Sequence, residues 1–586
     1  MKKALVFTLL IETSPQALPL GAACISSSIK AYPPLKDMLE TRLLKCSKED
    51  VGFTEDNAVD FCKKIILSSF SDANNSDAVN SAGKKTSSPD QKAKTQGDGN
   101  SSIPDFILFS LFVWNRKILC QLSKKIKEEF PSVITIAGGP EVTSSPSSFS
   151  EFDYLVSGQG EEITPLLLED LISGKNLLSK NKILFGSVND LGKLVSPYLS
   201  GEIKLSEYQG ALWELARGCP FKCSYCYESK GEKKIRYFPE ERLKKELELF
   251  AKEKIRQVFV LDPTYNADKK RALSMLDLIS KKAPDIFFYF EARAEFIDRE
   301  MAKAFTKVRC ALQFGLQSAD REVLKLVKRS LDKKVFSRNI GYLNEYGVVF
   351  GFDLIYGLPG DSLDGFKKSI DYAISLYPNN LETFCLSVLP GTSLYDEAES
   401  LSLVWQKEAP YHVIRTDKFS EKDMKNASFL SLAVSFLYNQ ARSVPFFNSM
   451  LFYFNKKPSA FFEDFYKWIR SNGYEDFVRE SVNLCSKSHL EIEELVIKFI
   501  KDYLNKRSAP EKCVKAFLSI IRMNGALSRL EESGKEEIIN VDFYPDDLMS
   551  EAAFDIRYFS KYAKECKCKV RVFLDKMGQL SWKRLK

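Results

Sequence analysis

Histidine is nearly absent from this chain of 586 residues, which contains only His412 and His489. Everything before His412 therefore lacks an imidazole that could bind a metal or act as a general base. The chain also lacks an apolar run of the roughly 20 residues that span a bilayer, so we expect a protein without a membrane span. It has 13 cysteines but no repeating cysteine framework. That usage argues against a secreted disulfide scaffold and predicts a reducing, cytoplasmic location.

The charge balance is mild for a chain of this length. The net charge is +7 and charged residues make up 28 % of the chain, which gives no clear nucleic-acid site. The basic C-terminal segment, KCKVRV to WKRLK, is typical of a solvated face. A chain of this length has room for two or three domains.

Residues 1–195 alternate strand and helix signals. Strand patterns cover 4–11, 105–112, 132–139 and 152–158, with another ending at residue 46. Helical patterns lie between them, which predicts a doubly wound, Rossmann-like parallel sheet. Residues 72–102 are rich in Ser, Asn, Asp, Lys and Gly, which predicts a disordered surface insertion.

A second strand–helix series occupies residues 205–416. Its strand patterns cover 211–217, 256–262, 286–292, 309–318, 348–357 and 381–389. Six successive units of this kind predict a partial (β/α)6 barrel of the TIM type. From residue 417 to 586 the signals are mainly helical, with strand-like stretches at 539–545 and 569–575. We therefore expect a mainly helical α+β domain at the C-terminus.

Three cysteines, Cys219, Cys223 and Cys226, stand in the run ARGCPFKCSYCY just after the first barrel strand. On one short loop they can direct three thiolates at a single centre, and thiolates favour iron–sulfur clusters or zinc. Three ligands for four irons would leave one iron open to a substrate. Zinc would need a fourth ligand, usually in a second pair, and chance spacing is the remaining alternative.

With Tyr225 just before its third cysteine, this segment resembles the signature of the radical S-adenosylmethionine (SAM) superfamily. The resemblance implies a 4Fe-4S cluster on Cys219, Cys223 and Cys226, with SAM chelating the open iron and Tyr225 among the residues that contact SAM. Reductive cleavage of SAM would then give a 5′-deoxyadenosyl radical. The electron donor would be a protein such as flavodoxin or ferredoxin. No side chain of the chain itself can be assigned a catalytic role from the sequence.

Further barrel residues lie at positions that bind SAM in members of this family. The segment from Asp353 to Asp361 resembles its adenine-contacting segment, with Ile355, Gly357 and Gly360 in matching positions; a plain βα turn is the alternative. Asp262 stands where many members have a Gly-Gly-Glu motif for the methionyl amino group. Polar residues at other predicted strand ends suit the ribose or the methionyl carboxylate: Glu291, Arg293, Gln317 and Ser318.

The N-terminal region resembles the cobalamin-binding domain that precedes some radical SAM barrels. The matching residues are glycines at two predicted strand ends, Gly138 with Gly139 and Gly158 with Gly160. The cobalamin signature that carries a histidine is missing. Trp114 follows the third strand instead and could cover the lower corrin face without binding cobalt. A Rossmann-like domain kept for structure, and a merely buried Trp114, are the alternatives.

The sequence therefore predicts a radical SAM enzyme, with cobalamin-dependent methyl transfer to an unactivated carbon as the favoured reaction and an unknown substrate. A rearrangement without methyl transfer, or a non-catalytic iron–sulfur or corrin sensor, are the alternatives. Two further features are predicted to be structural. Cys566 and Cys568 lie on one face of a strand-like segment, and His412 has no visible partner.

Overall fold

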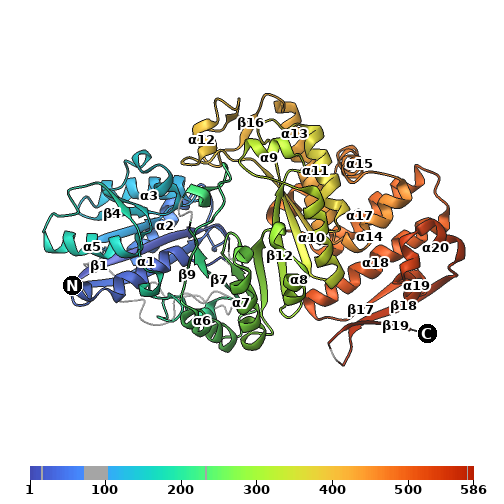
Figure 1. The fold of residues 1–586 in the computed structure, drawn as a ribbon, viewed down its shortest axis with the longest axis horizontal. Coiled ribbons are helices and arrows are strands. Elements are labelled where there is room, and N and C mark those ends of the chain that lie inside the picture. The colour runs from blue at the N-terminus through green and yellow to red at the C-terminus, as the bar shows by residue number, and fades with distance from the viewer. Residues whose placement is uncertain (13, 15–16, 71–102, 231–233, 577, 586) are drawn as a thin grey trace, which may run out of the picture.

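The structure is a computed structural model, and it describes residues 1–586 apart from 13, 15–16, 71–102, 231–233, 577 and 586. The predicted insertion at 72–102 lies outside the described residues. The chain forms three regions side by side along the long axis of the molecule (Figure 1). The N-terminal sheet lies at one end, the barrel in the middle and the C-terminal helices with a small sheet at the other end. Among the described residues, no helix is long and apolar enough to cross a membrane.

The N-terminal sheet has six parallel strands, and helices cover both of its faces. Alternate residues of β1 face two separate apolar cores, Leu5 and Phe7 one core and Ala4 and Val6 the other. This explains why β1 is apolar throughout instead of alternating. In sheet order the strands are β2 (Leu39–Ser47), β1 (Lys2–Leu10), β3 (Phe106–Ser110), β4 (Ile134–Gly138), β5 (Tyr154–Gly158) and β6 (Ile183–Gly186). The helices are α1 (Leu20–Ala31), α2 (Ala58–Ser68), α3 (Arg116–Glu129), α4 (Pro140–Ser144) and α5 (Gly160–Ser173).

The central sheet also has six parallel strands, with β7 and β14 at its two edges. The predicted partial (β/α)6 barrel is therefore confirmed. Its strands are β7 (Gly210–Trp213), β10 (Gln257–Val260), β11 (Phe287–Ala292), β12 (Cys310–Gln317), β13 (Val349–Tyr356) and β14 (Asn380–Cys385). Its helices are α6 (Glu240–Lys252), α7 (Lys269–Lys282), α8 (Arg299–Phe305), α9 (Arg321–Leu326), α10 (Lys333–Tyr346) and α11 (Leu363–Ser375). Shorter elements accompany them: β8 (Ala216–Arg217), β9 (Arg236–Tyr237), α12 (Ser393–Glu397), β15 (Val404–Trp405) and β16 (Val413–Arg415).

Burial alternates strictly along β12: Leu312 and Phe314 are buried, whereas Gln313 and Gly315 are only half-buried. A similar alternation along β11 leaves Glu291 exposed between two buried neighbours. Because successive side chains of a strand point to opposite faces, one face of the barrel sheet packs against its helices and the other faces an accessible interior. The polar residues of these strands thus lie inside the barrel.

The C-terminal region covers the edge of the barrel sheet at β14. Asn439 lies in a π-helical turn (Ser435–Gln440) after α13 (Glu421–Val434). Its side-chain amide accepts a hydrogen bond from the backbone N–H of Leu381 (3.1 Å) and donates one to its C=O (3.0 Å). An edge strand otherwise presents unpaired backbone groups. Asn439 satisfies them as a neighbouring strand would.

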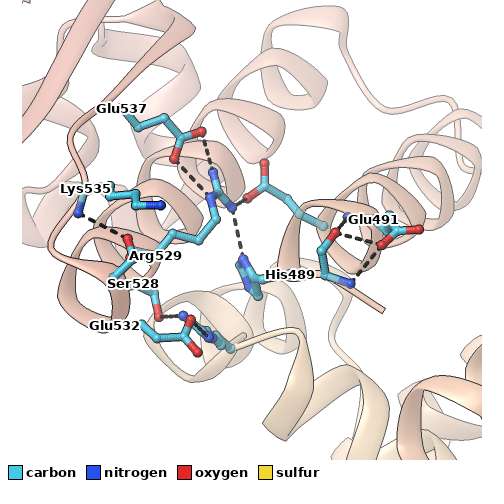
Figure 2. A network of polar contacts seen from close by, with 11 residues as sticks. His489, Glu491, Ser528, Arg529, Glu532, Lys535 and Glu537 are labelled. Atoms are coloured by element: carbon cyan, nitrogen blue, oxygen red, sulfur yellow. Dashed lines mark hydrogen bonds and ion pairs between the residues drawn. The ribbon is translucent and has the colours of Figure 1, made fainter. Parts of the chain in front are cut away.

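The remaining helices form a bundle that ends in a three-stranded antiparallel sheet. Arg529 on α18 joins its parts, because it pairs with Glu493 of α17 at 2.5 Å and with Glu537 of β17 at 3.0 Å (Figure 2). The helices are α14 (Val444–Phe454), α15 (Pro458–Ser471), α16 (Glu475–Leu484), α17 (His489–Asn505), α18 (Glu511–Ser533), α19 (Pro545–Leu548) and α20 (Ile556–Tyr562). The strands are β17 (Glu537–Phe543), β18 (Glu565–Leu574) and β19 (Leu580–Leu585). The predicted mainly helical α+β region is confirmed.

Candidate functional site

A cavity of about 660 Å³ lies at the carboxyl ends of the N-terminal strands. In open parallel sheets this is where ligands bind. Most of its wall is aliphatic or glycine and comes from β1, α1, β3, β4 and β5. Residues of the barrel close the other side: Leu212, Glu214, Arg217 and Leu261. The cavity therefore lies between the N-terminal sheet and the first strands of the barrel.

All four predicted glycines, Gly138, Gly139, Gly158 and Gly160, line this cavity. Two of them are also required by the backbone itself. Gly139 has φ +102°, and a Cβ there would lie 2.6 Å from the carbonyl oxygen of Leu111. Gly158 has φ +92°, and a Cβ there would lie 2.4 Å from a backbone oxygen. Because only glycine tolerates these conformations and contacts, the two residues let the ends of β4 and β5 pack closely on neighbouring backbone at the edge of the cavity.

Trp114 lines the same cavity. Its indole stacks on Phe112 with ring centroids 4.5 Å apart and planes 9° apart, and its Nε1 donates a hydrogen bond to the C=O of Leu9 (3.2 Å). The side chain is 37 % exposed. Trp114 is therefore not a core residue: it is a fixed aromatic surface in the cavity wall.

Buried ion pairs connect the N-terminal region to the barrel beside the cavity. Arg217, two residues before the first cysteine of the loop, pairs with Glu161 of α5 at 2.7 Å and with Glu214 at 2.8 Å. Burial raises the pKa of Glu214 and Arg217 lowers it, with burial the larger effect. On α4, Glu141 pairs with Arg116 at 2.7 Å and accepts a hydrogen bond from Tyr411 (2.9 Å). Sequence reasoning missed these contacts because the partners are far apart in the chain.

The cysteine loop follows β8 directly. Cys219 and Cys223 are buried and Cys226 is half-buried. The backbone N–H of Cys226 donates to the C=O of Cys223 (3.1 Å), which folds the loop back on itself. In the described residues, no three His, Cys, Asp or Glu side chains are already drawn together as a metal site. The loop nevertheless supplies three soft thiols within eight residues of chain, and thiolates are the ligands that hold cubane iron clusters.

Arg329, after α9, holds this loop against β12. Its Nη1 lies 3.8 Å from Cys223 Sγ and 3.3 Å from Tyr225 Oη, and its Nη2 donates to the C=O of Gly315. Tyr225, predicted to contact SAM, thus lies half-buried beside the second cysteine. Nothing in the sequence around Arg329 indicated this role, because the contact joins residues about a hundred positions apart.

Two predicted SAM contacts lie close to the start of the cysteine loop. Asp262 Oδ1 accepts hydrogen bonds from the backbone N–H groups of Leu215 (2.9 Å) and Ala216 (3.0 Å). Burial raises the pKa of Asp262 to about 7. The guanidinium of Arg293 stacks over Phe221, inside the loop, at 4.1 Å, and its Nε makes no hydrogen bond.

The other predicted contacts are distributed over β11, β13 and the end of β12. Glu291 and Ile355 face the barrel interior, whereas the hydroxyl of Ser318 is buried and lies 3.5 Å from that of Ser369 on α11. Gln317 has φ +66° at a break in the strand register, and its Oε1 is buried without a partner.

Two predicted glycine contacts instead face protein. A Cβ at Gly357 would lie 2.9 Å from Met424, and one at Gly360 would lie 2.7 Å from Leu326. Both glycines have positive φ.

Carboxylates gather inside the barrel, where Asp353 lies close to Glu291 and Glu382. Asp353 Oδ1 accepts a hydrogen bond from Gln313 (2.7 Å), and its pKa is raised to about 7, first by burial and then by Glu291 and Glu382. The alternation of side chains along β12 and β13 would have predicted that Gln313 and Asp353 face the barrel interior. His412 lies apart from this group, with its backbone paired to Ser387, and burial lowers its pKa.

Comparison with known proteins identifies the barrel region. The Radical SAM superfamily pattern matches residues 213–373. The chain is 26 % identical to the cobalamin-dependent radical SAM methyltransferase TokK of Streptomyces tokunonensis over 50 % of this chain and 48 % of that protein. It is 28 % identical to the 2-(S-pantetheinyl)-carbapenam-3-carboxylate methyltransferase of Streptantibioticus cattleyicolor over 46 % and 44 %. The chain spans about half the length of these curated relatives.

A solved structure shares the arrangement of all three regions. The cobalamin-dependent SAM radical enzyme OxsB with aqua-cobalamin bound superposes with a TM-score of 0.55 over 99 % of this chain and 85 % of that chain, at 14 % identity. This likeness shows the fold. Residues 213–373 thus match the Radical SAM superfamily, and the cysteine loop lies within them.

Proposed function

We propose that this protein is a cobalamin-dependent radical SAM methyltransferase that acts on an unactivated carbon. We place the cobalamin-binding domain at residues 1–195, the radical SAM barrel at 205–416 and an accessory domain at 417–586. The observation that carries the proposal is the cavity between the strand ends of the N-terminal sheet and the barrel, close to the cysteine loop. The names of the curated relatives support the same reaction class.

The cysteine loop fits a 4Fe-4S cluster by its donor chemistry. Cys219, Cys223 and Cys226 would each hold one iron, which leaves the fourth for SAM. When bound, the cluster supplies the electron that cleaves SAM. Arg329 fixes the loop through Cys223 and Tyr225, and Phe221 under Arg293 packs it on another side. These contacts orient the three thiols relative to the barrel interior, where SAM and substrate would meet.

The N-terminal cavity suits cobalamin by its largely apolar wall and by its glycine-lined edge at the strand ends. When bound there, the corrin carries the methyl group between SAM and substrate. Gly139 and Gly158 fix the backbone at the edge of the cavity, and Trp114 offers a flat aromatic face that binds no cobalt. Glu161 and Arg217 hold the barrel over the cavity. Because no histidine precedes His412, the lower face of the corrin would have no imidazole ligand from this domain.

The assignment is tested by SAM cleavage. Anaerobically reconstituted protein should be brown and should release 5′-deoxyadenosine from SAM when a reductant is added. Replacing Cys219, Cys223 and Cys226 together by Ala should abolish both the colour and the product. If 5′-deoxyadenosine persists in that variant, the cluster assignment fails. If the wild-type protein forms 5′-deoxyadenosine but binds no corrin, the radical SAM assignment stands and the methyltransferase assignment fails.

A further inference from the structure

A second set of thiols lies on the C-terminal sheet, remote from the cysteine loop. Cys566 and Cys568 lie on β18 with their sulfur atoms 3.5 Å apart, and Cys568 Sγ also lies 3.1 Å from the carbonyl oxygen of Cys566. Cys566 is half-buried and Cys568 is buried. One sulfur of the pair is therefore accessible to a small molecule, and the second lies directly behind it.

A β-bulge explains this proximity. Val541 pairs with Cys568 and Phe543 pairs with Glu565, so Cys566 and Lys567 together lie opposite Asp542. In a regular strand, residues two apart are separated by roughly 6.6 Å or more, near the upper limit for the Cα atoms of a disulfide. A bulge bends the strand locally. It brings the two thiols into contact without a change of fold.

The surroundings of Cys566 favour its thiolate. A hydrogen bond from Tyr544 is the main reason that its pKa is lowered, and Cys568, Arg584 and Lys564 add to the effect. The guanidinium of Arg584 stacks over the Tyr544 ring at 4.9 Å, which keeps both beside the thiol. Residues 561–586 contain nine Lys or Arg and two Asp or Glu. A thiolate at Cys566 thus lies near the cations of Arg584 and Lys564, which attract anionic reagents.

The chain contains a matched pair without these features. Cys46 on β2 and Cys62 on α2 have sulfur atoms 4.0 Å apart, but the two residues are 1 % and 0 % exposed. The hydrogen bond with Cys62, together with burial, strongly raises the pKa of Cys46. Proximity alone is therefore common to both pairs. An accessible sulfur and a lowered thiol pKa occur only in the pair on β18, and both belong to Cys566.

We propose that Cys566 and Cys568 form a redox-active dithiol that exchanges with low-molecular-weight anionic disulfides. The Cys566 thiolate attacks one sulfur of the disulfide, which forms a mixed disulfide and releases one thiolate. Cys568 loses its proton to solvent and attacks the Cys566 sulfur, which closes the intramolecular disulfide and releases the second thiolate. The dithiol is oxidised by two electrons and the small disulfide is reduced to two thiols. Excess thiol reverses the exchange. This site is independent of the proposed methyl transfer.

The test uses the full-length protein and glutathione disulfide as the probe. After timed incubation without oxygen, free thiols are alkylated and chymotryptic peptides are weighed. We expect the peptide with both cysteines to lose two hydrogens, while Cys46 and Cys62 remain alkylated. Cys485, an exposed cysteine, is the rate reference. Cys566 should react at least tenfold faster than Cys485, and faster with glutathione disulfide than with the cationic disulfide cystamine.

Two variants separate the roles of the sulfurs. Cys568→Ser should stop at the mixed disulfide on Cys566, and Cys566→Ser should leave Cys568 alkylated. Unchanged far-ultraviolet circular dichroism establishes that each variant is folded. The proposal is overturned if Cys566 reacts no faster than Cys485, if the wild-type protein accumulates the mixed disulfide, or if Cys46 and Cys62 oxidise first. None of these results bears on 5′-deoxyadenosine formation.

Discussion

Among the residues that line the N-terminal cavity, Trp114 allows the most direct test of cobalamin binding. Replacing it by Ala removes an aromatic surface that the hydrogen bond to Leu9 and the stack on Phe112 hold in place. We expect the Kd for cobalamin to rise about tenfold, which corresponds to about 1.4 kcal/mol. The measurement is a titration followed by corrin absorption. Phe185→Ala on β6 is the control, because this side chain is 77 % exposed and does not line the cavity. Equal effects of the two substitutions would refute the assignment of Trp114.

Asp262 gives the fold a pH dependence. Its pKa is about 7 in the folded protein and 3.8 in the absence of burial. Between these values the folded state holds a proton that the unfolded chain has lost. The stability from this group is therefore full below pH 3.8 and is lost as the pH rises through 7.

Asp262→Asn tests this effect, because the amide keeps an acceptor for Leu215 and Ala216 but cannot ionise. We expect the Tm of the cluster-free variant to rise relative to the wild type as the pH rises from about 4 to 7, the range over which the wild-type carboxyl loses its stabilising effect. At pH 8.5 it should exceed the wild type by about 2–4 °C, the shift that about 1 kcal/mol gives in a domain of this size. Exposed Asp285→Asn is the control. A difference that does not change with pH would contradict the raised pKa.

At the scale of elements, the helix α5 connects the N-terminal region to the barrel through Glu161. Glu161→Gln breaks its ion pair with Arg217 but leaves Arg217 paired with Glu214. We expect SAM cleavage to 5′-deoxyadenosine to stay within about twofold. Formation of S-adenosylhomocysteine, which reports methyl transfer to the corrin, should fall about tenfold, a loss of about 1.4 kcal/mol. The neighbouring Glu162→Gln has the same change of charge and should alter neither product. An equal fall of 5′-deoxyadenosine and S-adenosylhomocysteine would contradict this prediction, because it would show that the substitution impairs the barrel itself.

The π-helical turn that carries Asn439 completes the edge of the barrel sheet. Asn439→Ala leaves the backbone groups of Leu381 without partners, and an unsatisfied buried group costs about 1–3 kcal/mol. We therefore expect a lower midpoint of thermal unfolding and faster amide exchange at Leu381. Asn505→Ala, at the exposed end of α17, should change neither. Unchanged exchange at Leu381 in the Asn439 variant would show that this edge is stable without the contact.

The elements with long apolar patterns could be predicted from sequence, because burial on both faces makes a strand such as β1 continuously apolar. Two short elements were missed: β6 has four residues and α9 has six, too few to establish a period. The cysteine loop and the glycines could be found because each motif is local. Arg329, and the pairing of Glu161 with Arg217, depend on tertiary contact between distant segments. No spacing in the sequence encodes such contacts.

At the scale of the whole molecule, the proposed reaction requires two cofactors that lie on opposite sides of one interface. The cysteine loop and the corrin cavity belong to different sheets, and Arg217 lines the cavity and lies two residues from Cys219. With one cofactor on each side of this interface, SAM could react in two ways. Its sulfonium can be cleaved reductively beside the cysteine loop, or its methyl group can be transferred to the corrin. The C-terminal region supports the barrel from the opposite edge.

These two outcomes can be measured in a single experiment. Reconstituted protein is incubated anaerobically with SAM and a strong reductant, with and without cobalamin, and both nucleoside products are quantified. The account predicts 5′-deoxyadenosine in both samples and S-adenosylhomocysteine only with cobalamin. In the variant with Cys219, Cys223 and Cys226 replaced by Ala, 5′-deoxyadenosine should be lost. Equal S-adenosylhomocysteine with and without cobalamin, or none in either sample, would contradict a cobalamin-dependent methyltransferase.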